Sequence, residues 1–256
     1  MLKFTDLCAG YDGVQKLHRV SAEIPEGRLT AIIGPNGCGK STLIKCAAGI
    51  LKPSGGTILL SGRPICRIGE KERARCVAYM PQSRIVPDIS VGQLVAHGRY
   101  PHLKWGHNLS AADREIIEGA LRRTGLTEYA RRSVGQLSGG ERQRAYIAMM
   151  LAQQTPVMLL DEPTTYLDPS AQFALMELFR SLCREGRSAV AVLHDLALAL
   201  EYADNVLLMH EGAVAARGTP EEVYNSGKIQ DVFDIEILRL DSGKYVFSQR
   251  GQGERP

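Results

Sequence analysis

The stretch at residues 34–42 constrains this chain more than any other. It reads Gly-Pro-Asn-Gly-Cys-Gly-Lys-Ser-Thr and matches the phosphate-binding loop, in which four residues separate a first glycine from a Gly-Lys-Ser sequence. A short apolar run at 29–33 precedes the stretch, and apolar residues at helical spacing follow it. The sequence therefore predicts a loop that joins a buried strand to a helix.

The residue types in this loop suit the binding of phosphate groups. Gly34, Gly37 and Gly39 let the backbone bring bare N–H groups against phosphate oxygens, and the helix N-terminus adds partial positive charge. Lys40 can then reach the β- and γ-phosphates of a nucleotide, while Ser41 can bind Mg²⁺. The alternative, a glycine-rich turn that only caps a helix, does not account for strand, loop, Lys-Ser pair and helix in register.

Composition places the chain among ordinary globular proteins of one large or two small domains. It has 256 residues, of which 44% are hydrophobic and 23% charged. The net charge is only +3 and its basic residues are dispersed, so no nucleic-acid partner is expected. Six scattered cysteines without a Cys-x-x-Cys pair favour reduced thiols in a cytosol. No signal peptide or membrane-spanning run is recognised, so we expect a chain that is soluble by itself and able to dock on a membrane protein.

The order of the patterns predicts an α/β fold with a helical insertion. Strands are expected at residues 2–9, in a pair that brackets 25–27, and at 57–60, 75–80, 157–160 and 189–193. Helices are expected within 83–154, where Ser110 begins one, and at 170–184, at 196–203 and after a capping box at Thr219. A hairpin is expected at 205–216.

We expect these elements to form a single domain over residues 1–250. Its core comprises about 1–82 and 155–220, its helical subdomain about 83–154, and its C-terminal extension about 221–250. Residues 251–256 are expected to be a frayed tail.

Two adjacent carboxylates, Asp161 and Glu162, follow the apolar run at 157–160. The carboxyl end of such a strand is where open α/β sheets bind ligands. Asp161 is placed to hold Mg²⁺, directly or through water, and Glu162 to polarise the water that attacks the γ-phosphate. Two solvated acids at a strand end are the alternative, which the phosphate loop makes less favourable.

A second helix start lies at Ser138, within the sequence Gln-Leu-Ser-Gly-Gly-Glu-Arg-Gln-Arg. Ser138 and Glu141 fit a capping box. Gly139 and Gly140, however, fall in the first turn, where each costs about 0.5–1 kcal/mol relative to alanine, so something must approach the bare backbone closely. An anion is the natural candidate, which suggests that phosphates are gripped from two sides.

The phosphate loop, Leu-Ser-Gly-Gly-Glu and Leu-Leu-Asp-Glu-Pro-Thr, in this order, resemble an ATP-binding cassette ATPase over nearly the whole chain. The resemblance implies a P-loop NTPase fold of the ABC type, with a helical subdomain insertion and an antiparallel β subdomain. It also implies a head-to-tail homodimer in which Ser138, Gly139 and Gly140 of one subunit complete the ATP site held by Lys40 of the other. ATP and Mg²⁺ are then the expected cofactors.

The same resemblance assigns roles to further residues. Gln82 resembles the glutamine that senses Mg²⁺ and the γ-phosphate, Asp168 the dimer-contacting aspartate, and His194 the switch histidine; alone, a histidine at such a strand end is more often structural. Tyr11 resembles the adenine-stacking aromatic, although its spacing fits a packed core tyrosine equally well. The expected catalytic residues are Lys40, Gln82, Glu162 and His194. The expected metal ligands are Ser41, Gln82 and Asp161. The expected nucleotide-binding residues are Tyr11, Gly34, Pro35, Asn36, Gly37, Cys38, Gly39, Lys40, Ser41, Thr42, Ser138, Gly139, Gly140 and Asp168.

A finer resemblance lies at residues 98–102, 145–153 and 161–168, which are similar to the ATPases of bacterial iron-siderophore importers. Many cassettes have Ala-Arg-Ala-Leu at this place, and Met149 and Met150 depart from it as the siderophore ATPases do. Neutral sequence drift in a helix that faces the core is the alternative explanation. The implied function is the ATPase of a ferric-siderophore importer, bound to permease subunits at the cytoplasmic face of the inner membrane and served by a binding protein. Import of haem or cobalamin is the second choice for the cargo, and import of zinc or manganese is the third. A soluble cassette ATPase outside transport is the rival from another class, while a small-molecule kinase would not need the helix start at Ser138.

Overall fold

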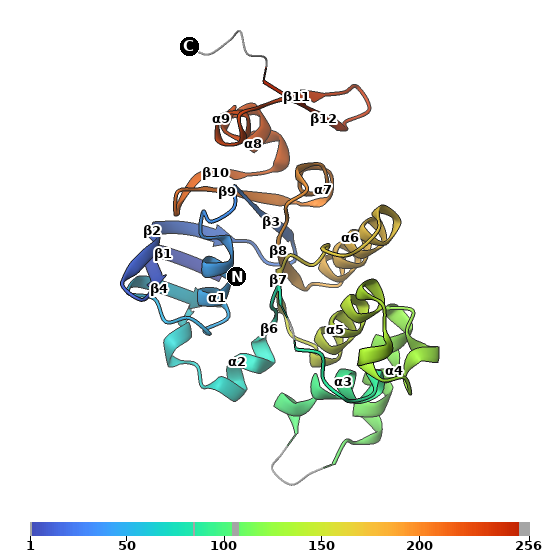
Figure 1. Cartoon of the computed structure of the whole chain (residues 1–256). Coiled ribbons are helices and arrows are strands. Elements are labelled where there is room, and N and C mark those ends of the chain that lie inside the picture. Colours follow the sequence, from blue (N-terminus) through green and yellow to red (C-terminus); the bar gives the residue numbers. More distant parts are fainter. Residues whose placement is uncertain (1, 84, 104–107, 251–256) are drawn as a thin grey trace.

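The computed structural model describes residues 2–83, 85–103 and 108–250 (Figure 1). Its centre is a six-stranded sheet with the order β10-β9-β3-β8-β7-β6. Neighbouring strands from β9 to β6 are parallel, and β10 pairs antiparallel with β9. The strands are β3 (Leu29–Ile33), β6 (Val77–Met80), β7 (Val157–Asp161), β8 (Ser188–Val192), β9 (Asn205–His210) and β10 (Ala213–Gly218).

A second, four-stranded sheet has the order β2-β1-β4-β5 and only antiparallel pairs. Its strands are β1 (Leu2–Tyr11), β2 (Val14–Ile24), β4 (Gly55–Leu60) and β5 (Arg63–Pro64). The strand pair expected around residues 25–27 is therefore wrong as a pair, because β2 and β3 belong to different sheets. The turn at 25–27 carries the chain from one sheet to the other.

The helix α1 (Lys40–Ala47) lies between the two sheets, and the packing of β3 shows why. Ile32 belongs to a core cluster that includes Leu43 and Ile44 of α1 and the apolar side of β1. Ala31 and Ile33 face the other way, into a cluster formed with the helices beyond the sheet. Because successive residues of a strand point to opposite faces, a strand covered on both sides must be mostly apolar. Indeed β3, β7 and β8 are buried at every residue.

The segment between β6 and β7 is mostly helical, as the sequence predicts, and it gathers at one end of the molecule (Figure 1). Ser110 begins its helix as expected, since its Oγ accepts a hydrogen bond from Asp113 N–H at 3.1 Å. The elements are α3 (Val91–His97), η2 (Tyr100–His102), α4 (Ala111–Arg123), η3 (Thr127–Tyr129), η4 (Val134–Gln136) and α5 (Gly139–Gln153).

The remaining helices complete the layers around the parallel sheet. A short η1 (Ile65–Arg67) and α2 (Glu70–Cys76) precede β6, so the strand expected at 75–80 begins only at Val77. On the other side, α6 (Pro169–Arg184) and α7 (Leu196–Tyr202) alternate with β7, β8 and β9 as the sequence predicts.

The C-terminal elements lie at the end opposite the helical segment (Figure 1). They are α8 (Pro220–Asn225), α9 (Lys228–Phe233), β11 (Ile235–Arg239) and β12 (Tyr245–Gln249). The hairpin of β9 and β10 and the capping box at Thr219 are confirmed. The tail expected at 251–256 lies outside the described residues.

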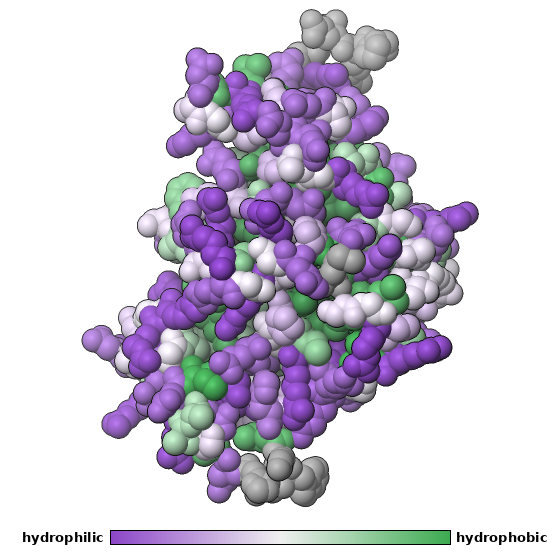
Figure 2. Space-filling model, turned by 180° about the vertical axis from the view of Figure 1, so that it is seen from behind, coloured by the Kyte–Doolittle hydropathy of each residue, from purple (hydrophilic) through white to green (hydrophobic). Residues whose placement is uncertain are grey.

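Hydrophobic side chains form only small, separate patches among hydrophilic ones on the face seen from behind (Figure 2). Within the described ranges, none of the helices combines the length and the apolar character that crossing a bilayer requires.

Candidate active site

The phosphate-loop sequence joins β3 to α1, and two of its glycines have conformations that other residues adopt only with strain. Gly34 and Gly39 have φ values of +149° and +102°. A Cβ on Gly34 would collide with the carbonyl oxygen of Met209, and one on Gly39 would lie 2.7 Å from Leu17 Cδ2. Gly212, in the β9–β10 turn, also holds the loop, because its N–H donates to the Cys38 carbonyl at 3.1 Å. The loop is thus fixed by both sheets.

Lys40 is buried against this loop, with only 6% of its surface exposed. Its Nζ donates to the carbonyl oxygens of Gly34 at 2.6 Å and Pro35 at 2.8 Å. An ammonium group at this place supplies the positive charge that nucleotide phosphates need. Thr42 is buried beside it, and Cys38 is a buried thiol whose pKa is raised by burial.

Ser41 and Asp161 are far apart in the sequence but meet at the sheet edge. Ser41 Oγ donates a hydrogen bond to Asp161 Oδ1 at 2.9 Å. Burial raises the pKa of Asp161, while the hydrogen bond from Ser41 acts in the opposite direction. A hydroxyl and a carboxylate side by side are ligands that suit Mg²⁺, which takes few protein oxygens together with substrate phosphates and water. Among the described residues, no group of three or more His, Cys, Asp or Glu side chains could hold a metal ion.

The carboxylate of Glu162 contacts two other expected site residues. Its Oε2 accepts a hydrogen bond from Gln82 Nε2 at 2.8 Å, and its Oε1 lies 2.6 Å from His194 Nε2. Glu162 has φ +55°, which is uncommon outside glycine and is tolerated mainly at constrained sites. The structure therefore brings Gln82, Glu162 and His194 together.

Strand order explains this convergence. The strands β3, β8, β7 and β6 are neighbours and parallel, so the residues that follow them share one edge of the sheet. Lys40 follows β3, His194 follows β8, Glu162 follows β7 and Gln82 follows β6. This carboxyl edge is where α/β sheets bind ligands.

The helix start at Ser138 is built as expected but lies apart from this edge. Ser138 Oγ accepts from Glu141 N–H at 3.3 Å, and Glu141 Oε2 accepts from Ser138 N–H at 2.8 Å, which completes a capping box. These bonds lower the pKa of Glu141. Ser138 and Gly139 are exposed, and over the described part of the chain no hydrogen bond links Ser138, Gly139 or Gly140 to the phosphate loop.

Tyr11 and Asp168 are the two remaining expected site residues. Tyr11 is 40% exposed, and Lys45 Nζ lies 5.7 Å from its ring centroid, so it is not a packed core residue. This position agrees with a platform for an aromatic base. Asp168 is exposed and caps α6, because its Oδ1 accepts from Ala171 N–H at 3.0 Å.

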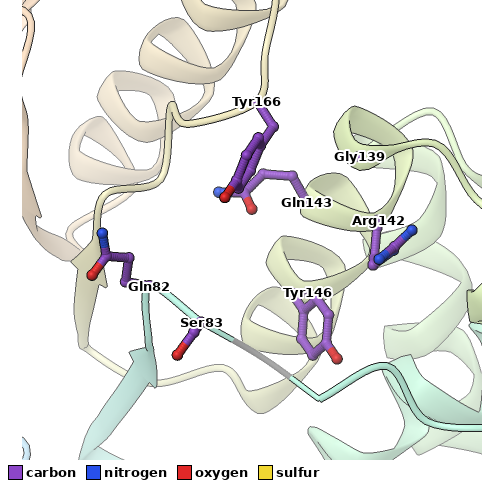
Figure 3. Close-up of a pocket in the computed structure, with 7 residues that line it drawn as sticks. All are labelled: Gln82, Ser83, Gly139, Arg142, Gln143, Tyr146 and Tyr166. Atoms are coloured by element: carbon purple, nitrogen blue, oxygen red, sulfur yellow. The ribbon is translucent and has the colours of Figure 1, made fainter.

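Two features of the site region were missed by sequence reasoning. One is Gln143, a buried side chain whose Nε2 donates to the Pro163 carbonyl and ties α5 to the loop after Glu162. The other is a pocket of about 440 Å³ beside that contact (Figure 3). It is lined by Gln82, Ser83, Gly139, Arg142, Gln143, Tyr146 and Tyr166. Only tertiary structure unites these residues, so no local signal could have revealed the pocket.

A nucleoside triphosphate can be held at Lys40 and a water molecule activated at Glu162, so the fold and the site together define a cassette-type ATPase. The family model described as ABC transporter matches residues 17–165. The chain belongs to this family.

Individual members of this family are similar to the chain over most of its length. The petrobactin import ATP-binding protein FpuD of Bacillus anthracis is 47% identical over 222 residues, which cover 86% of this chain and 81% of FpuD. The ferric enterobactin transport ATP-binding protein FepC of Escherichia coli K12 is 43% identical over 242 residues, which cover 94% of this chain and 89% of FepC. Among solved structures, the dimeric ATP-binding cassette MJ0796 bound to ADP and Pi has a TM-score of 0.76 and 26% identity, and the match covers 86% of this chain and 99% of that one.

Proposed function

We propose that this chain is the ATP-hydrolysing subunit of a bacterial ABC importer that energises uptake of a ferric siderophore. The observation that supports this cargo most strongly is the similarity to two iron-chelate import ATPases across more than four fifths of the chain. Met150 is buried in α5 and Met149 packs against the same core, so the residues that suggested this group from sequence also fit a core-facing helix.

In the proposed reaction, Lys40 binds the β- and γ-phosphates and the loop N–H groups surround them. Glu162 accepts the proton of the attacking water, while Gln82 and His194 orient its carboxylate. Bound Mg²⁺, held by Ser41 and Asp161 with Gln82 nearby, would neutralise charge on the phosphates. Tyr11 would stack on the adenine ring.

The working form is proposed to be a head-to-tail homodimer in which Ser138, Gly139 and Gly140 of one subunit complete the ATP site at Lys40 of the other, with Asp168 at the contact. The exposure of Ser138 and Gly139 and their separation from their own phosphate loop support the idea, since the capping box uses the N–H groups of Ser138 and Glu141 and leaves those of Gly139 and Gly140 to face an anion. The dimeric state of MJ0796 gives further support.

Permease subunits are the proposed membrane partners, at the cytoplasmic face of the inner membrane, with a substrate-binding protein delivering cargo from outside. The segment after Gln82 is suited to contact them, because Ile85, Val86 and Tyr100 are 91%, 40% and 56% exposed. It is also tied to α5, since Tyr146 donates to the Ile85 carbonyl at 2.7 Å. Movement of this segment would therefore reach the helix that begins at Ser138.

A gene deletion tests the proposed cargo. Loss of the chain should abolish uptake of a radiolabelled ferric siderophore and leave cobalamin uptake intact, with the wild-type gene on a plasmid as the control. The opposite pattern would assign the chain to cobalamin, and a corresponding assay with haem covers the other alternative. Unchanged uptake of all three would favour a soluble cassette ATPase outside transport.

A further inference from the structure

A small cavity lies between α4, α5 and α6, which run side by side on one flank of the molecule (Figure 1). Its volume is about 180 Å³, and its apolar wall includes Ile147 of α5 together with Leu175 and Leu178 of α6. Ala171 and Ala174 line it as well, where larger side chains would fill the space. Since an apolar cavity of about 150 Å³ can hold benzene, this one has room for a single aromatic ring or branched alkyl group.

Arg144 of α5 also lines this cavity and is half-buried. Among the residues that the structure describes, none forms a hydrogen bond or an ion pair with its guanidinium. Glu141, one turn earlier on α5, is already engaged, because its Oε2 accepts the Ser138 N–H at 2.8 Å in the capping box. A guanidinium carries five N–H donors, and withdrawing them from water is costly unless they find acceptors. Arg144 is therefore suited to bind an anion at the cavity.

The surroundings of the cavity carry an excess of positive charge. Arg123, the other cation that lines it, already donates to both carboxylate oxygens of Glu185, at 2.9 and 2.6 Å. Nη1 of Arg187 is buried without a hydrogen-bond partner in the described part of the chain. Burial lowers the pKa of Arg187, and the positive charge of Arg123 acts in the same direction. Over the described ranges, Glu185 is thus the one carboxylate that pairs with Arg123, Arg144 or Arg187.

We propose that this cavity binds a small apolar carboxylate, whose ring or branched alkyl group fills the space between the helices while its carboxylate pairs with Arg144. The planar guanidinium matches a carboxylate through two parallel hydrogen bonds, which makes the pairing directional. Small-molecule sites are mostly apolar, with a few polar groups that fix the orientation of the ligand, and the cavity has this arrangement. Its lining residues differ from those assigned to the nucleotide, so the inference does not depend on the proposed transport function.

The test titrates the full chain, without nucleotide, with benzoate and follows binding by ligand-detected NMR. Benzoate should saturate one site per chain. Benzyl alcohol lacks the charge and acetate lacks the ring, so each should bind about 10-fold more weakly or worse, as expected for losing a charge-assisted contact or the apolar one. Equal binding of benzyl alcohol would reveal a cavity that selects only for an apolar group, and equal binding of acetate would reveal only a surface ion pair. Either result would overturn the inference.

Substitutions of arginine test the charged half of the site. Arg144→Met keeps an apolar stem and removes the charge, so it should raise the Kd of benzoate about 10-fold or more. Arg144→Lys keeps the charge and should lose less affinity. Arg122→Met is the matched control, because Arg122 is exposed on α4 and pairs with Glu118 rather than lining the cavity. It should bind benzoate as the parent does.

Ala174→Leu tests the apolar half by filling the cavity from an exposed position of α6. Leucine is a good helix former, so the unfolding temperature should not fall, yet benzoate binding should be lost. Ala112→Leu, at an exposed position of α4, is the control and should bind normally. Parent-like binding by Ala174→Leu or by Arg144→Met would overturn the inference, as would failure of the parent to bind benzoate. In that last case, crosslinks from a photoreactive residue at position 174 to the permease would assign the cavity to a protein side chain.

Discussion

At the scale of single residues, the proposed mechanism makes hydrolysis depend on Glu162, whose carboxylate contacts Gln82 and His194. Glu162→Gln should keep ATP binding and lower turnover about 10²–10⁴-fold, because the amide cannot accept a proton from water. Steady-state phosphate release and equilibrium nucleotide binding measure the two effects separately. Near-normal hydrolysis by the variant would remove Glu162 from its proposed role.

Lys40→Ala provides the contrasting variant in the same experiment. It should lose nucleotide affinity, because it removes the charge that lies against the loop carbonyls of Gly34 and Pro35. Lys52→Ala removes an exposed lysine beyond α1 and should change neither quantity. The two site variants therefore separate binding from chemistry.

Arg99 and Asp113 form a buried ion pair in which Arg99 Nε lies 2.9 Å from Asp113 Oδ1. Hydrogen bonds from Ser110 and then Arg99 lower the pKa of Asp113 to about 2. Because this pKa is lower in the folded chain than in the unfolded one, the stabilisation is fully present above about pH 5 and is lost as the pH falls toward 2. Asp113→Asn should thus lower the free energy of unfolding by about 2 kcal/mol at pH 6, and by progressively less at lower pH. Urea denaturation from pH 6 to pH 3 measures this, and a constant difference would contradict it.

At the scale of elements, the start of α5 should control association. Ser138→Arg places a long side chain where the partner's γ-phosphate is expected, so it should prevent the ATP-driven dimer of the Glu162→Gln chain. Ser90→Arg is a matched control, because Ser90 caps α3 with the same capping-box geometry and its loss costs a similar 1 kcal/mol or so. Gel filtration with ATP compares them. A Ser138→Arg dimer would refute the shared site, whereas a Ser90→Arg monomer would indicate a general effect of cap loss.

Substitutions in the segment between β6 and α4 should weaken the coupling of ATP hydrolysis to transport and leave hydrolysis itself unchanged. Polar substitutions at Val86 or Tyr100 should leave the ATPase of the isolated chain unchanged and lower transport by the assembled importer, since both side chains are exposed and neither contacts Glu162. ATPase and uptake assays on the same variants make the comparison. Equal losses in both assays would place these residues in the catalytic machinery instead.

Elements whose patterns are local could be predicted from the sequence. The buried strands β7 and β8 read as apolar runs, and the caps at Ser110, Ser138 and Thr219 follow from side chains within three residues. The membership of β2 and β3 in different sheets could not be predicted, because pairing depends on distant partners. Residues 75–76 extend α2 rather than β6 for a related reason, since helical and strand patterns overlap at a short boundary.

Some features of the site could likewise be predicted from local sequence, and others could not. Lys40, Ser41, Asp161 and Glu162 follow from motif chemistry, and their placement at one sheet edge follows from parallel strands. The roles of Gln82 and His194 needed the family resemblance, and the structure adds only that both reach the Glu162 carboxylate. The pocket beside Gln82 could not be predicted, because the residues that line it come from three separate segments of the chain.

At the scale of the whole molecule, one sheet edge holds the phosphate loop and the acidic pair, while α5, whose start at Ser138 is the proposed second anion site, belongs to the helical segment at one end (Figure 1). This separation explains why a single subunit would need a partner to close its nucleotide site. The segment after Gln82 also connects the proposed nucleotide site to the helical end, because Gln82 contacts Glu162 and the Ile85 carbonyl accepts a hydrogen bond from Tyr146 of α5. Nucleotide binding at the sheet edge can therefore be transmitted to the helical segment.

If ATP hydrolysis at Glu162 drives import of a ferric siderophore, as we propose, transport by the reconstituted complex should show it most directly. Membrane vesicles would contain the permease with this chain, the binding protein loaded with radiolabelled ferric siderophore on one side, and ATP on the side of the ATPase. We predict accumulation of iron label with the wild-type chain and none with Glu162→Gln, although the variant assembles and binds ATP. Equal accumulation with both chains would contradict the account.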